Sequence, residues 1–379
     1  MDTSCTRAEI DLRAVARNTR ELRRITNPKA RMMAVVKANA YGHGVLKISK
    51  TVLANGADAL GVARIDEALL IRNSGIDAPI LILGYTSPDH TASLIRYDLT
   101  QTIGSREFAE SFSEAAGKEK AALKIQLKID SGMGRLGFMP DRSNAFSRIL
   151  KEMEVIIRLP NLLVQGIYTH FARADLKDKT SSYQQLEIFN ELVERLHLSM
   201  GFETPIRHAA NSAAVIDMPD THLDMVRPGI ALYGLYPSQE VDRNKILLQP
   251  VMELKSRILH LKKVPAGFPV SYGGTWRATK KTTIATVPIG YADGYNRLLS
   301  STGHMLVCGK KAPIAGRVCM DLTMLDVGDI PETCVNDEVV VFGRQENASI
   351  FADEIAKTLG TINYEIVSTI TERVPRVFF

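Results

Sequence analysis

The sequence predicts an α/β protein in which a (β/α)8 TIM-type barrel is followed by a mostly antiparallel β domain. Short apolar runs alternate with helical patterns from about residue 30 to residue 235, and about eight runs fit within that length. After residue 245, short runs are instead separated by Gly, Pro and Asp turns, which is typical of antiparallel strands. An open doubly wound sheet is the alternative to the barrel.

The apolar runs of the first part are rich in Val, Ile and Leu and apolar on both faces, as are strands of a parallel sheet covered by helices. They are MMAVVKAN (32–39), ALGVA (59–63), PILILGY (79–85), LTQTIG (99–104), LKIQLKID (123–130), LLVQGIYTH (162–170), PIRHAANS (205–212) and MVRPGIALYG (225–234). Helical patterns lie between them and suggest right-handed crossovers. Two of these patterns are Leu12, Val15, Thr19, Leu22, Ile25 and Leu186, Phe189, Val193, Leu196, the second with Ser181 or Ser182 as its cap.

The second part begins after a polar stretch, SQEVDRNK (238–245), that looks like a linker. We therefore expect a barrel domain over residues 1–240 and a β domain over residues 241–379. The strand candidates of the β domain are MELKSRILHL, TTIATVPI, HMLVC, LTMLDV and EVVVFG, and SIFADEIAKTLG is a helix candidate.

The composition is that of a globular protein, since 45% of the 379 residues are hydrophobic and 23% are charged. A net charge of +5 is mild for this length and gives no argument for a nucleic acid partner. No apolar run approaches the roughly 20 residues of a membrane span. No signal peptide is evident, so a cytoplasmic protein is expected. No metal site is expected either, because there is no HExxH and no CxxC; the cysteines should be reduced and mostly buried. They are Cys5, Cys308, Cys319 and Cys334.

Lys37 is the first candidate for chemistry, because it closes an apolar run, AVVK, and glycines follow at Gly42 and Gly44. At the C-terminal end of the first barrel strand, it would point into the mouth where barrel active sites lie. Burial lowers the pKa of a lysine and makes its amine a nucleophile or a base. The alternative is a lysine that extends its amine to solvent from a strand end.

KIDSGMGRLGF (128–138) contains a GxGxxG pattern after a strand, which raises the alternative of a dinucleotide site and a dehydrogenase. Such a site should run straight into a helix and stand near the start of its domain. Here Phe-Met-Pro-Asp follows, and about four strands precede. We therefore expect Arg135 to project from a glycine loop at the barrel mouth, where its guanidinium suits a carboxylate or a phenolate. A plain surface arginine is the alternative.

The seventh and eighth runs carry features of a phosphate site. Ser212 opens a short helix in HAANSAA, and Gly229 and Ile230 offer backbone N–H groups in VRPGIALYG. Barrel enzymes often bind phosphate in the loops after strands 7 and 8, so a phosphorylated ligand or cofactor is expected. His170 and Arg227 lie near strand ends, although a lone histidine is more often structural than catalytic.

Taken together, ten segments resemble the bacterial alanine racemase family of barrel-type pyridoxal-phosphate enzymes. They follow in family order and span nearly the whole chain, and only the charges of Arg173 and Glu372 beside them are unexpected. The segments are AVVKANAYGHG (34–44), KIDSGMGRLGF (128–138), YTHFA (168–172), HAANSAA (208–214), VRPGIALYGLYPS (226–238), SYGGTW (271–276), IGYADGYNR (289–297), GRVCMDLTMLDV (316–327), INYEIV (362–367) and RVPR (373–376).

The resemblance implies that Lys37 binds pyridoxal 5′-phosphate covalently and that Arg227 faces the pyridine nitrogen of this cofactor. It implies that Arg135 and the backbone N–H of Met320 bind the substrate carboxylate. It also implies that the barrel lysine Lys128 can carry a carbamate. The residues implied to hold the cofactor's phosphate are Tyr41, Ser212, Gly229, Ile230 and Tyr364.

The implied reaction is racemisation of alanine, which supplies D-alanine for peptidoglycan. Lys37 would act on the D-alanine face and Tyr272 on the L-alanine face, with His170 orienting Tyr272. The resemblance further implies a head-to-tail homodimer whose sites combine one barrel with the partner's β domain. The first strand-like residues, about 10 in number, would pack on the β domain. The alternatives are a racemase of serine or of many amino acids, a barrel-type amino-acid decarboxylase, and a non-catalytic pyridoxal-phosphate carrier.

Overall fold

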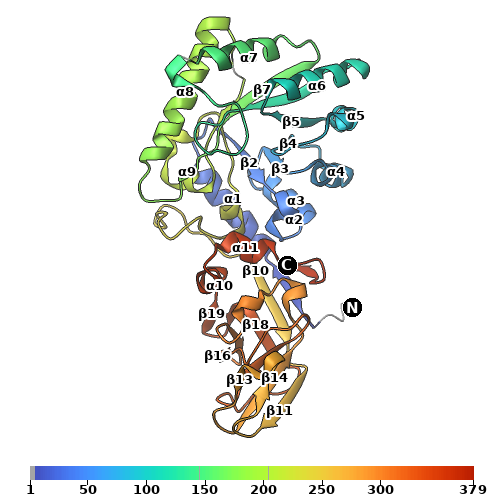
Figure 1. Cartoon of the computed structure of the whole chain (residues 1–379), viewed down its shortest axis with the longest axis vertical. Helices are drawn as coiled ribbons and strands as arrows, with labels where there is room; N and C mark the ends of the chain where they lie inside the picture. Colours follow the sequence, from blue (N-terminus) through green and yellow to red (C-terminus); the bar gives the residue numbers. More distant parts are fainter. Residues whose placement is uncertain (1–4, 145, 204) are drawn as a thin grey trace. The chain divides into compact units, whose positions relative to one another are not determined.

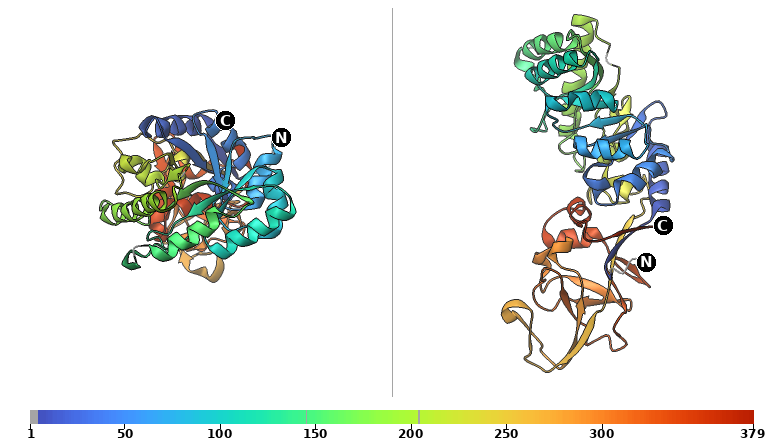
Figure 2. Two further views of the ribbon diagram at one scale, coloured as in Figure 1. Left: turned by 90° about the horizontal axis from the view of Figure 1, so that it is seen from above. Right: turned by 90° about the vertical axis from the view of Figure 1, so that its right-hand side faces the viewer.

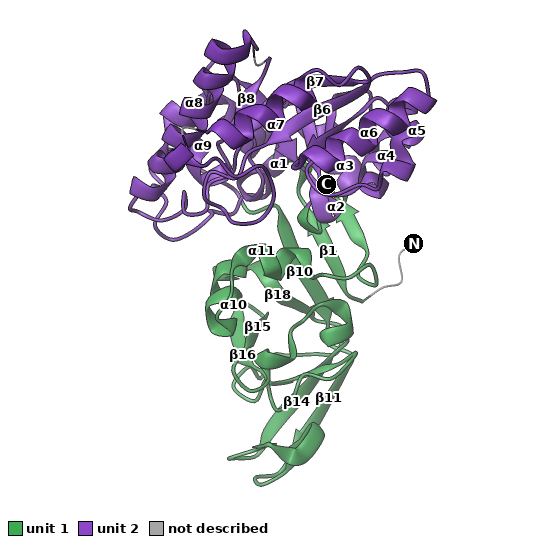
Figure 3. Ribbon diagram, turned by 45° about the horizontal axis from the view of Figure 1, so that its top comes forward, with its two compact units in different colours: residues 1–13, 41–44, 250–379 green, residues 14–40, 45–249 purple. Residues whose placement is uncertain are grey.

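The protein is described by a computed structural model over residues 5–144, 146–203 and 205–379. The chain divides into two compact units, which Figure 3 shows in different colours. Unit 1 comprises residues 1–13, 41–44 and 250–379, and unit 2 comprises residues 14–40 and 45–249. The contacts thus place the main division between residues 249 and 250, and they assign a short segment near the start of the chain to unit 1.

The described residues of unit 2 form a closed barrel of parallel strands, which confirms the predicted barrel over the open sheet (Figures 1 and 2). The ring is closed by pairing between β2 and β9, in which Arg31 lies opposite Met225 and Met32 opposite Val226. The strands are β2 (Arg31–Val35), β3 (Ala59–Val62), β4 (Ile80–Ile82), β5 (Leu99–Ile103), β6 (Leu123–Lys128), β7 (Leu162–Tyr168), β8 (Arg207–His208) and β9 (Met225–Val226).

Helices follow most barrel strands and cover their outer faces, as Figure 2 shows. The α-helices from α1 to α9 are α1 (Leu12–Ile25), α2 (Lys37–Tyr41), α3 (Val45–Leu53), α4 (Ile65–Asn73), α5 (Thr91–Arg96), α6 (Arg106–Lys118), α7 (Ser147–Ile157), α8 (Thr180–Met200) and α9 (Ser212–Asp217). Short 3-10 turns are η1 (Pro88–His90), η2 (Arg142–Asn144), η3 (Pro219–Thr221) and η4 (Ile230–Tyr233).

Two details of unit 2 differ from the sequence-based expectation. Helix α8 is not capped by Ser181 or Ser182, because it begins at Thr180, whose N–H donates to Asp178 Oδ1 at 2.9 Å. Residues 238–245 are not a loose linker, since they fold back on unit 2; Lys245 Nζ lies 3.5 Å from Asp217 Oδ1.

The barrel interior changes character along its axis. A cluster of Met33, Ala59, Leu81, Tyr168 and Met225 forms an apolar layer. Buried polar side chains form a second, polar layer. Gln126, His208 and Arg227 are hydrogen-bonded in series, while Thr102 hydrogen-bonds the hydroxyl of Tyr168 and Lys128 lies over the Tyr168 ring. Barrel interiors are usually filled by branched apolar residues. The polar layer is therefore the part of the barrel that calls for a functional explanation.

Unit 1 is a β domain, and its strand pairs are antiparallel except for β1 with β20, which confirms the predicted fold class. The described residues form a seven-stranded sheet of order β16-β15-β18-β10-β1-β20 with β19 beside β18, a three-stranded sheet β11-β14-β17, and the pair β12-β13. Strand β1 pairs with β10, Ala8 lying opposite Leu254; residues 1–4 lie outside the described residues.

The elements of unit 1 follow one another along the chain with short turns. Its strands are β1 (Arg7–Ile10), β10 (Met252–Arg257), β11 (His260–Val264), β12 (Pro269–Val270), β13 (Trp276–Arg277), β14 (Thr282–Val287), β15 (His304–Val307), β16 (Lys310–Pro313), β17 (Thr323–Asp326), β18 (Glu338–Gln345), β19 (Ala348–Ile350) and β20 (Arg376–Phe378). Its helices are η5 (Tyr272–Gly274), η6 (Tyr291–Asp293), η7 (Arg297–Leu299), α10 (Ala352–Leu359) and α11 (Asn363–Ser368).

The cysteines are less buried than expected: Cys334 is exposed, and Cys5, Cys308 and Cys319 are half-buried. None of the four lies in a helix or a strand of the described residues. None forms a disulfide within the part of the chain that the structure describes. Over the same residues, no helix is long and apolar enough to cross a membrane, and no group of three or more His, Cys, Asp or Glu residues could hold a metal ion.

Candidate active site

Lys37 follows strand β2 by two residues. The strand end is fixed by backbone bonds, since Val35 N–H donates to Pro228 O at 3.0 Å and Val36 N–H donates to Gly61 O at 2.8 Å. Burial and the charge of Arg135 lower the pKa of Lys37, and the charge of Glu67 opposes them. The amine has no hydrogen-bond partner among the described residues. A partly buried, unpaired amine of lowered pKa can act as a nucleophile or as a base.

Arg227 is the centre of a buried hydrogen-bond network. Its Nη1 donates to His208 Nδ1 at 2.7 Å, and its Nη2 donates to Thr169 O at 2.7 Å, Ala209 O at 3.0 Å and His170 Nδ1 at 3.2 Å. A guanidinium only donates, so both Nδ1 atoms accept and each imidazole carries its proton on Nε2. Burial lowers the pKa of Arg227 to about 10, which leaves it charged at neutral pH. Burial and the Arg227 charge hold the pKa of both histidines well below 6.5.

Tyr168 and Gln126 complete this network inside the barrel. His208 Nε2 lies 2.7 Å from Gln126 Oε1, and the ring of His208 stacks on that of Tyr168 with centroids 4.7 Å apart. Lys128 Nζ lies 4.6 Å from the centroid of the Tyr168 ring and, although buried, has no hydrogen-bond partner in the part of the chain that the structure describes. Burial, followed by the charges of Arg227 and Arg135, lowers the pKa of Lys128 to about 6. This amine is therefore mostly neutral at physiological pH.

The glycine loop after β6 is organised by one carboxylate. Asp130 Oδ1 accepts from the N–H groups of Gly132, Met133 and Gly134 at 2.8–3.0 Å, and Oδ2 accepts from Arg135 N–H at 2.8 Å. These N–H groups are thus unavailable to a pyrophosphate. Among the described residues that follow this loop, the first helix is η2, which begins at Arg142. Both findings exclude the dinucleotide site. The Arg135 side chain makes no ion pair among the described residues and lowers the pKa of the amines nearby.

The structure also brings together three residues predicted to hold a phosphate. Ser212 begins helix α9, which is capped by Asn211 Oδ1 accepting from Ala214 N–H at 3.1 Å. Ser212 Oγ accepts from Gly229 N–H at 2.8 Å. Ile230, the next residue, begins η4. A hydroxyl and neighbouring backbone N–H groups at two chain turns are a common setting for a phosphate group.

The remaining predicted residues lie in unit 1. Tyr272 follows Ser271, whose φ of 65° is in the left-handed region and whose Oγ donates to Arg317 O at 2.6 Å. The side chain of Tyr272 is 69% exposed. Met320 is 52% exposed, and its carbonyl accepts from Ala292 N–H at 3.0 Å. The rings of Tyr41 and Tyr364 lie 6.2 Å apart. Burial raises the pKa of Tyr41, so its phenol stays protonated.

The structure thus places eight predicted residues in unit 2 and four in unit 1. Those in unit 2 are Lys37, Lys128, Arg135, His170, Ser212, Arg227, Gly229 and Ile230; those in unit 1 are Tyr41, Tyr272, Met320 and Tyr364. Sequence reasoning missed four residues that support the site: Glu67, Gln126, Asp130 and Tyr168. Only Asp130 had a usable signal, since Asp before Ser-Gly is typical of a side chain that accepts from the following backbone.

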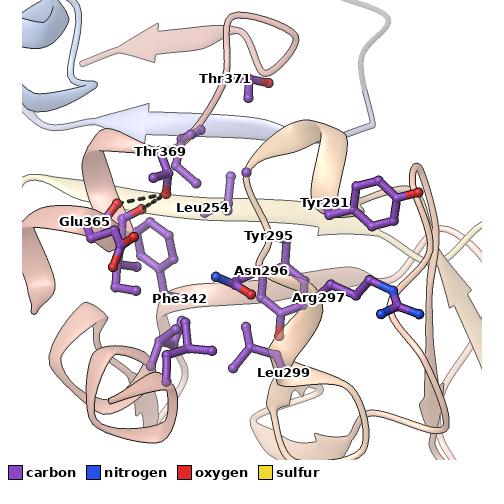
Figure 4. Close-up of a pocket in the computed structure, with 15 residues that line it drawn as sticks. Leu254, Tyr291, Tyr295, Asn296, Arg297, Leu299, Phe342, Glu365, Thr369 and Thr371 are labelled. Carbon is purple, nitrogen blue, oxygen red and sulfur yellow. Dashed lines mark hydrogen bonds between the residues drawn. The ribbon is translucent and has the colours of Figure 1, made fainter. Parts of the chain in front are cut away.

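Two cavities lie away from the residues predicted from the sequence, although Gln126 lines the second of them. One, of about 450 Å³, lies in unit 1 between residues 291–299 and helices α10 and α11, and Figure 4 shows Tyr295 and Asn296 at its wall. The other, of about 610 Å³, lies at the N-terminal ends of the barrel strands, where Arg31, Asp58 and Asp98 line it. Neither contains a residue predicted to act in catalysis.

Comparison with known proteins gives a consistent result over the whole chain. The family "Alanine racemase, N-terminal domain" matches residues 10–237, and "Alanine racemase, C-terminal domain" matches residues 251–378. An alanine racemase of Desulfosudis oleivorans is 53% identical over 98% of this chain and 96% of the relative. One of Methanococcus maripaludis is 48% identical over 98% of each chain.

Solved structures agree with the sequence matches. Alanine racemase from Clostridium difficile 630 superposes with a TM-score of 0.93 at 38% identity, covering 100% of this chain and 97% of that one. The enzyme from Bacillus anthracis with bound L-Ala-P superposes with a TM-score of 0.92 at 37% identity, covering 100% of this chain and 96% of that one.

Proposed function

The chain belongs to the alanine racemase family and is an isomerase that interconverts L-alanine and D-alanine, and on this premise we propose its cofactor, its bases and its assembly. The cofactor is pyridoxal 5′-phosphate, and the bases are Lys37 and Tyr272. The observation that carries the proposal is the unpaired amine of Lys37 in the same barrel as the buried Arg227 network. The family match makes the decarboxylase, the serine racemase and the carrier less favourable alternatives.

The residues present fit this cofactor. The amine of Lys37 and the Nε–H of Arg227 have no hydrogen-bond partner among the described residues. The amine could condense with the aldehyde of the cofactor, with release of water, and the Nε–H could donate to its ring nitrogen. Ser212 and the neighbouring Gly229 and Ile230, at two chain turns of unit 2, suit a phosphate. Tyr41 and Tyr364, whose rings are paired within unit 1, are the phenols that we propose bind it as well. When bound, the cofactor makes the Cα–H of alanine acidic, which is the difficult part of the chemistry.

Arg227 determines how that chemistry is used. Its guanidinium can only donate a hydrogen bond, so it favours a cofactor ring nitrogen that carries no proton. This weakens the withdrawal of electrons from the substrate. A decarboxylase would benefit from an acidic residue at this position, which would favour the protonated ring. The choice of arginine therefore supports proton exchange at Cα and disfavours side reactions.

Racemisation needs proton transfer on both faces of Cα. Lys37 removes or returns the proton on the D-alanine face, and Tyr272 does so on the L-alanine face. His170 accepts from Arg227 through Nδ1, so its Nε2–H is the group that can donate to the oxygen of Tyr272. Arg135 and the backbone N–H of Met320 hold the substrate carboxylate.

We propose that Lys128 reacts with carbon dioxide to form a carbamate. Its amine is buried, unpaired and mostly neutral at pH 7, which is the form that attacks carbon dioxide. The carbamate would place a negative charge beside Arg135 and Arg227, the two guanidinium groups that lower the pKa of the unmodified amine. It would thereby hold Arg135 in position for the substrate.

The assembly we propose is a head-to-tail homodimer in which each site combines one barrel with the partner's β domain. The exposure of Tyr272 and Met320 supports this, because a catalytic phenol works best where water is excluded. Leu136 and Met139, beside the glycine loop of unit 2, are also exposed, and a partner would cover them. The product D-alanine would serve peptidoglycan synthesis in the cytoplasm, whose reducing conditions suit the four cysteines.

Borohydride reduction tests the proposal. Protein loaded with pyridoxal phosphate should absorb in the visible range, lose this band on reduction and carry the label on Lys37 after peptide mapping. Before reduction, the same preparation should convert L-alanine to D-alanine faster than it converts L-serine. A label on another lysine, or no band after addition of pyridoxal phosphate, would refute the assignment of Lys37.

A further inference from the structure

The backbone after Lys37 adopts a conformation that L-amino acids rarely take. Ala38, Asn39, Ala40 and Tyr41 have φ of 52°, 53°, 54° and 51°, and together they form one left-handed helical turn. None of them is glycine. In this conformation Cβ lies too close to the following carbonyl oxygen, so each such residue is strained. A strained turn of this kind persists only where its surroundings hold it.

One carboxylate holds the start of this turn. Glu67 Oε1 accepts from Ala38 N–H at 2.5 Å, while Oε2 accepts from Ala63 N–H at 2.8 Å and from Arg64 N–H at 3.2 Å. Glu67 lies in the first turn of α4, where it also completes the cap of that helix. A single side chain therefore joins the loop after β2 to the loop after β3, two strands that are neighbours in the barrel.

The other bonds of the turn use different groups. Asn39 Oδ1 accepts from Val45 N–H at 2.8 Å, and Ala40 N–H donates to Val36 O at 2.9 Å. Among the described residues, only Glu67 accepts from the N–H of Ala38, the residue bonded directly to Lys37. The direction in which Lys37 leaves the chain thus depends on this one contact.

We propose that Glu67 is a positioning residue that fixes the left-handed turn after Lys37 and thereby presents the Lys37 amine to the substrate. This inference deepens the proposed function and rests on the role of Lys37 in it. Glu67 does not touch the reacting atoms. Its negative charge has a second effect, because it opposes the lowering of the pKa of Lys37 by burial and by Arg135.

Two substitutions distinguish the effect of Glu67 on the geometry of the turn from the effect of its negative charge. Glu67→Asp keeps the charge and can still cap α4, but the shorter side chain cannot reach both loops. Glu67→Gln keeps the length, but its amide group turns a donor toward one of the N–H groups and the charge is lost. Asp66→Asn is the matched control, because the neighbouring Asp66 is exposed and pairs only with Arg64, at 3.1 Å.

The experiment measures kcat and KM for alanine, the pH profile, and labelling of Lys37 by an acylating reagent in protein free of cofactor. Misplacement of a reacting group by about 1 Å costs roughly 100-fold in rate. We therefore expect Glu67→Asp to lower kcat about 10- to 100-fold with little change in KM. Glu67→Gln should lower kcat and move the labelling of Lys37, and the acid limb of the profile, to lower pH. Asp66→Asn should behave as the wild type.

Unchanged kcat in folded Glu67→Asp would overturn the proposal, and so would an equal loss in Asp66→Asn. A purely structural role would lower the melting temperature but leave the pH at which Lys37 is labelled in Glu67→Gln unchanged, which also contradicts it. Hydrogen exchange at Ala38 gives a direct measure, and it should become faster in both Glu67 variants. If Lys37 proves not to bind the cofactor, the labelling and exchange results still report on the turn, so the two failures are distinguishable.

Discussion

Tyr272 and Lys37 act on opposite faces of the substrate in the proposed reaction, so the loss of one should be visible in one enantiomer. L-alanine and D-alanine are equally abundant at equilibrium, so kcat/KM for racemisation must be equal in the two directions whatever the substitution. Exchange of the α-hydrogen in heavy water can be measured for each enantiomer separately and is free of this constraint. In Tyr272→Phe, exchange from L-alanine should slow about 10²–10⁴-fold, the usual contribution of a general base. Exchange from D-alanine should continue through Lys37. Tyr183→Phe, an exposed tyrosine on α8, is the control, and equal slowing of both enantiomers would contradict the assignment.

His208 and Gln126 show how a residue outside the site can set its chemistry. Arg227 forces Nδ1 of His208 to accept, so Nε2–H must donate to Gln126 Oε1. Gln126→Leu leaves this buried N–H without an acceptor, which costs about 1–3 kcal/mol of unfolding free energy. Gln165→Leu is the matched control, because Gln165 accepts a weaker bond from Thr100 at 3.2 Å and is only half-buried. Denaturant unfolding compares the two, and equal losses would contradict the role of Gln126.

At the scale of the element, the loop after β6 depends on Asp130. Partial burial opposes ionisation, but the four backbone N–H donors outweigh it and lower the pKa of Asp130 below 3.8. Asp130→Ala should cost about 1–2 kcal/mol, a value reduced for solvent exposure. Hydrogen exchange at Gly132 to Arg135 should become faster, and KM for alanine should rise as Arg135 loosens.

The pH dependence of this loss follows from the sign of the shift. Because the folded state lowers the pKa, the stabilisation is present above pH 3.8 and disappears as the pH falls through the folded value. The difference between wild type and Asp130→Ala should therefore be constant near neutral pH and shrink in acid. Asp141→Ala, which removes an acceptor for Ser143 in the next turn, should leave exchange at 132–135 unchanged. A difference that grows in acid would contradict this account.

Helices and strands could be predicted where the hydrophobic pattern was long. The residues at which they begin and end could not. The apolar runs at 205–212 and 225–234 become strands of only two residues, Arg207–His208 and Met225–Val226. Their apolar character continues because α9 and η4 are themselves buried, and hydrophobicity alone does not distinguish a buried helix from a buried strand. The left-handed turn after Lys37 had little signal either. Asn39 tolerates this conformation better than most residues, but Ala38, Ala40 and Tyr41 ordinarily favour others.

At the scale of the whole molecule, alternation of strands and helices was enough to predict the barrel, and the change of pattern was enough to predict a β domain. The assignment of residues 41–44 to unit 1 was not predictable. It depends on contacts with the far end of the sequence: Gly42 O accepts from Arg376 Nε at 2.9 Å, and a side chain at Gly42 would collide with Val367 O. Contacts between residues so far apart produce no periodic pattern in the sequence. The roles of individual residues were therefore predicted from family resemblance and not from their spacing.

The burial of Lys128 should make the unfolding free energy of the protein depend on pH. Its pKa is about 6 in the folded protein and 10.5 ordinarily, so the unfolded chain binds more protons between these values. Unfolding free energy must then rise with pH across this window, by up to about 1.4 kcal/mol for each unit.

Lys128→Met removes this titrating amine, so it should be more stable than wild type near pH 7. The difference in unfolding free energy between the two proteins should close towards pH 10. Lys124→Met, which removes a partly exposed partner of Asp98 from the same strand, is the control and should not reproduce the stabilisation expected of Lys128→Met near pH 7. The measurement is denaturant unfolding of cofactor-free protein in buffer without carbon dioxide, because a carbamate would remove the titrating amine. A gap between wild type and Lys128→Met that stays constant from pH 7 to pH 10 would show that Lys128 is not held neutral in the barrel, and the proposed carbamate would lose its chemical basis.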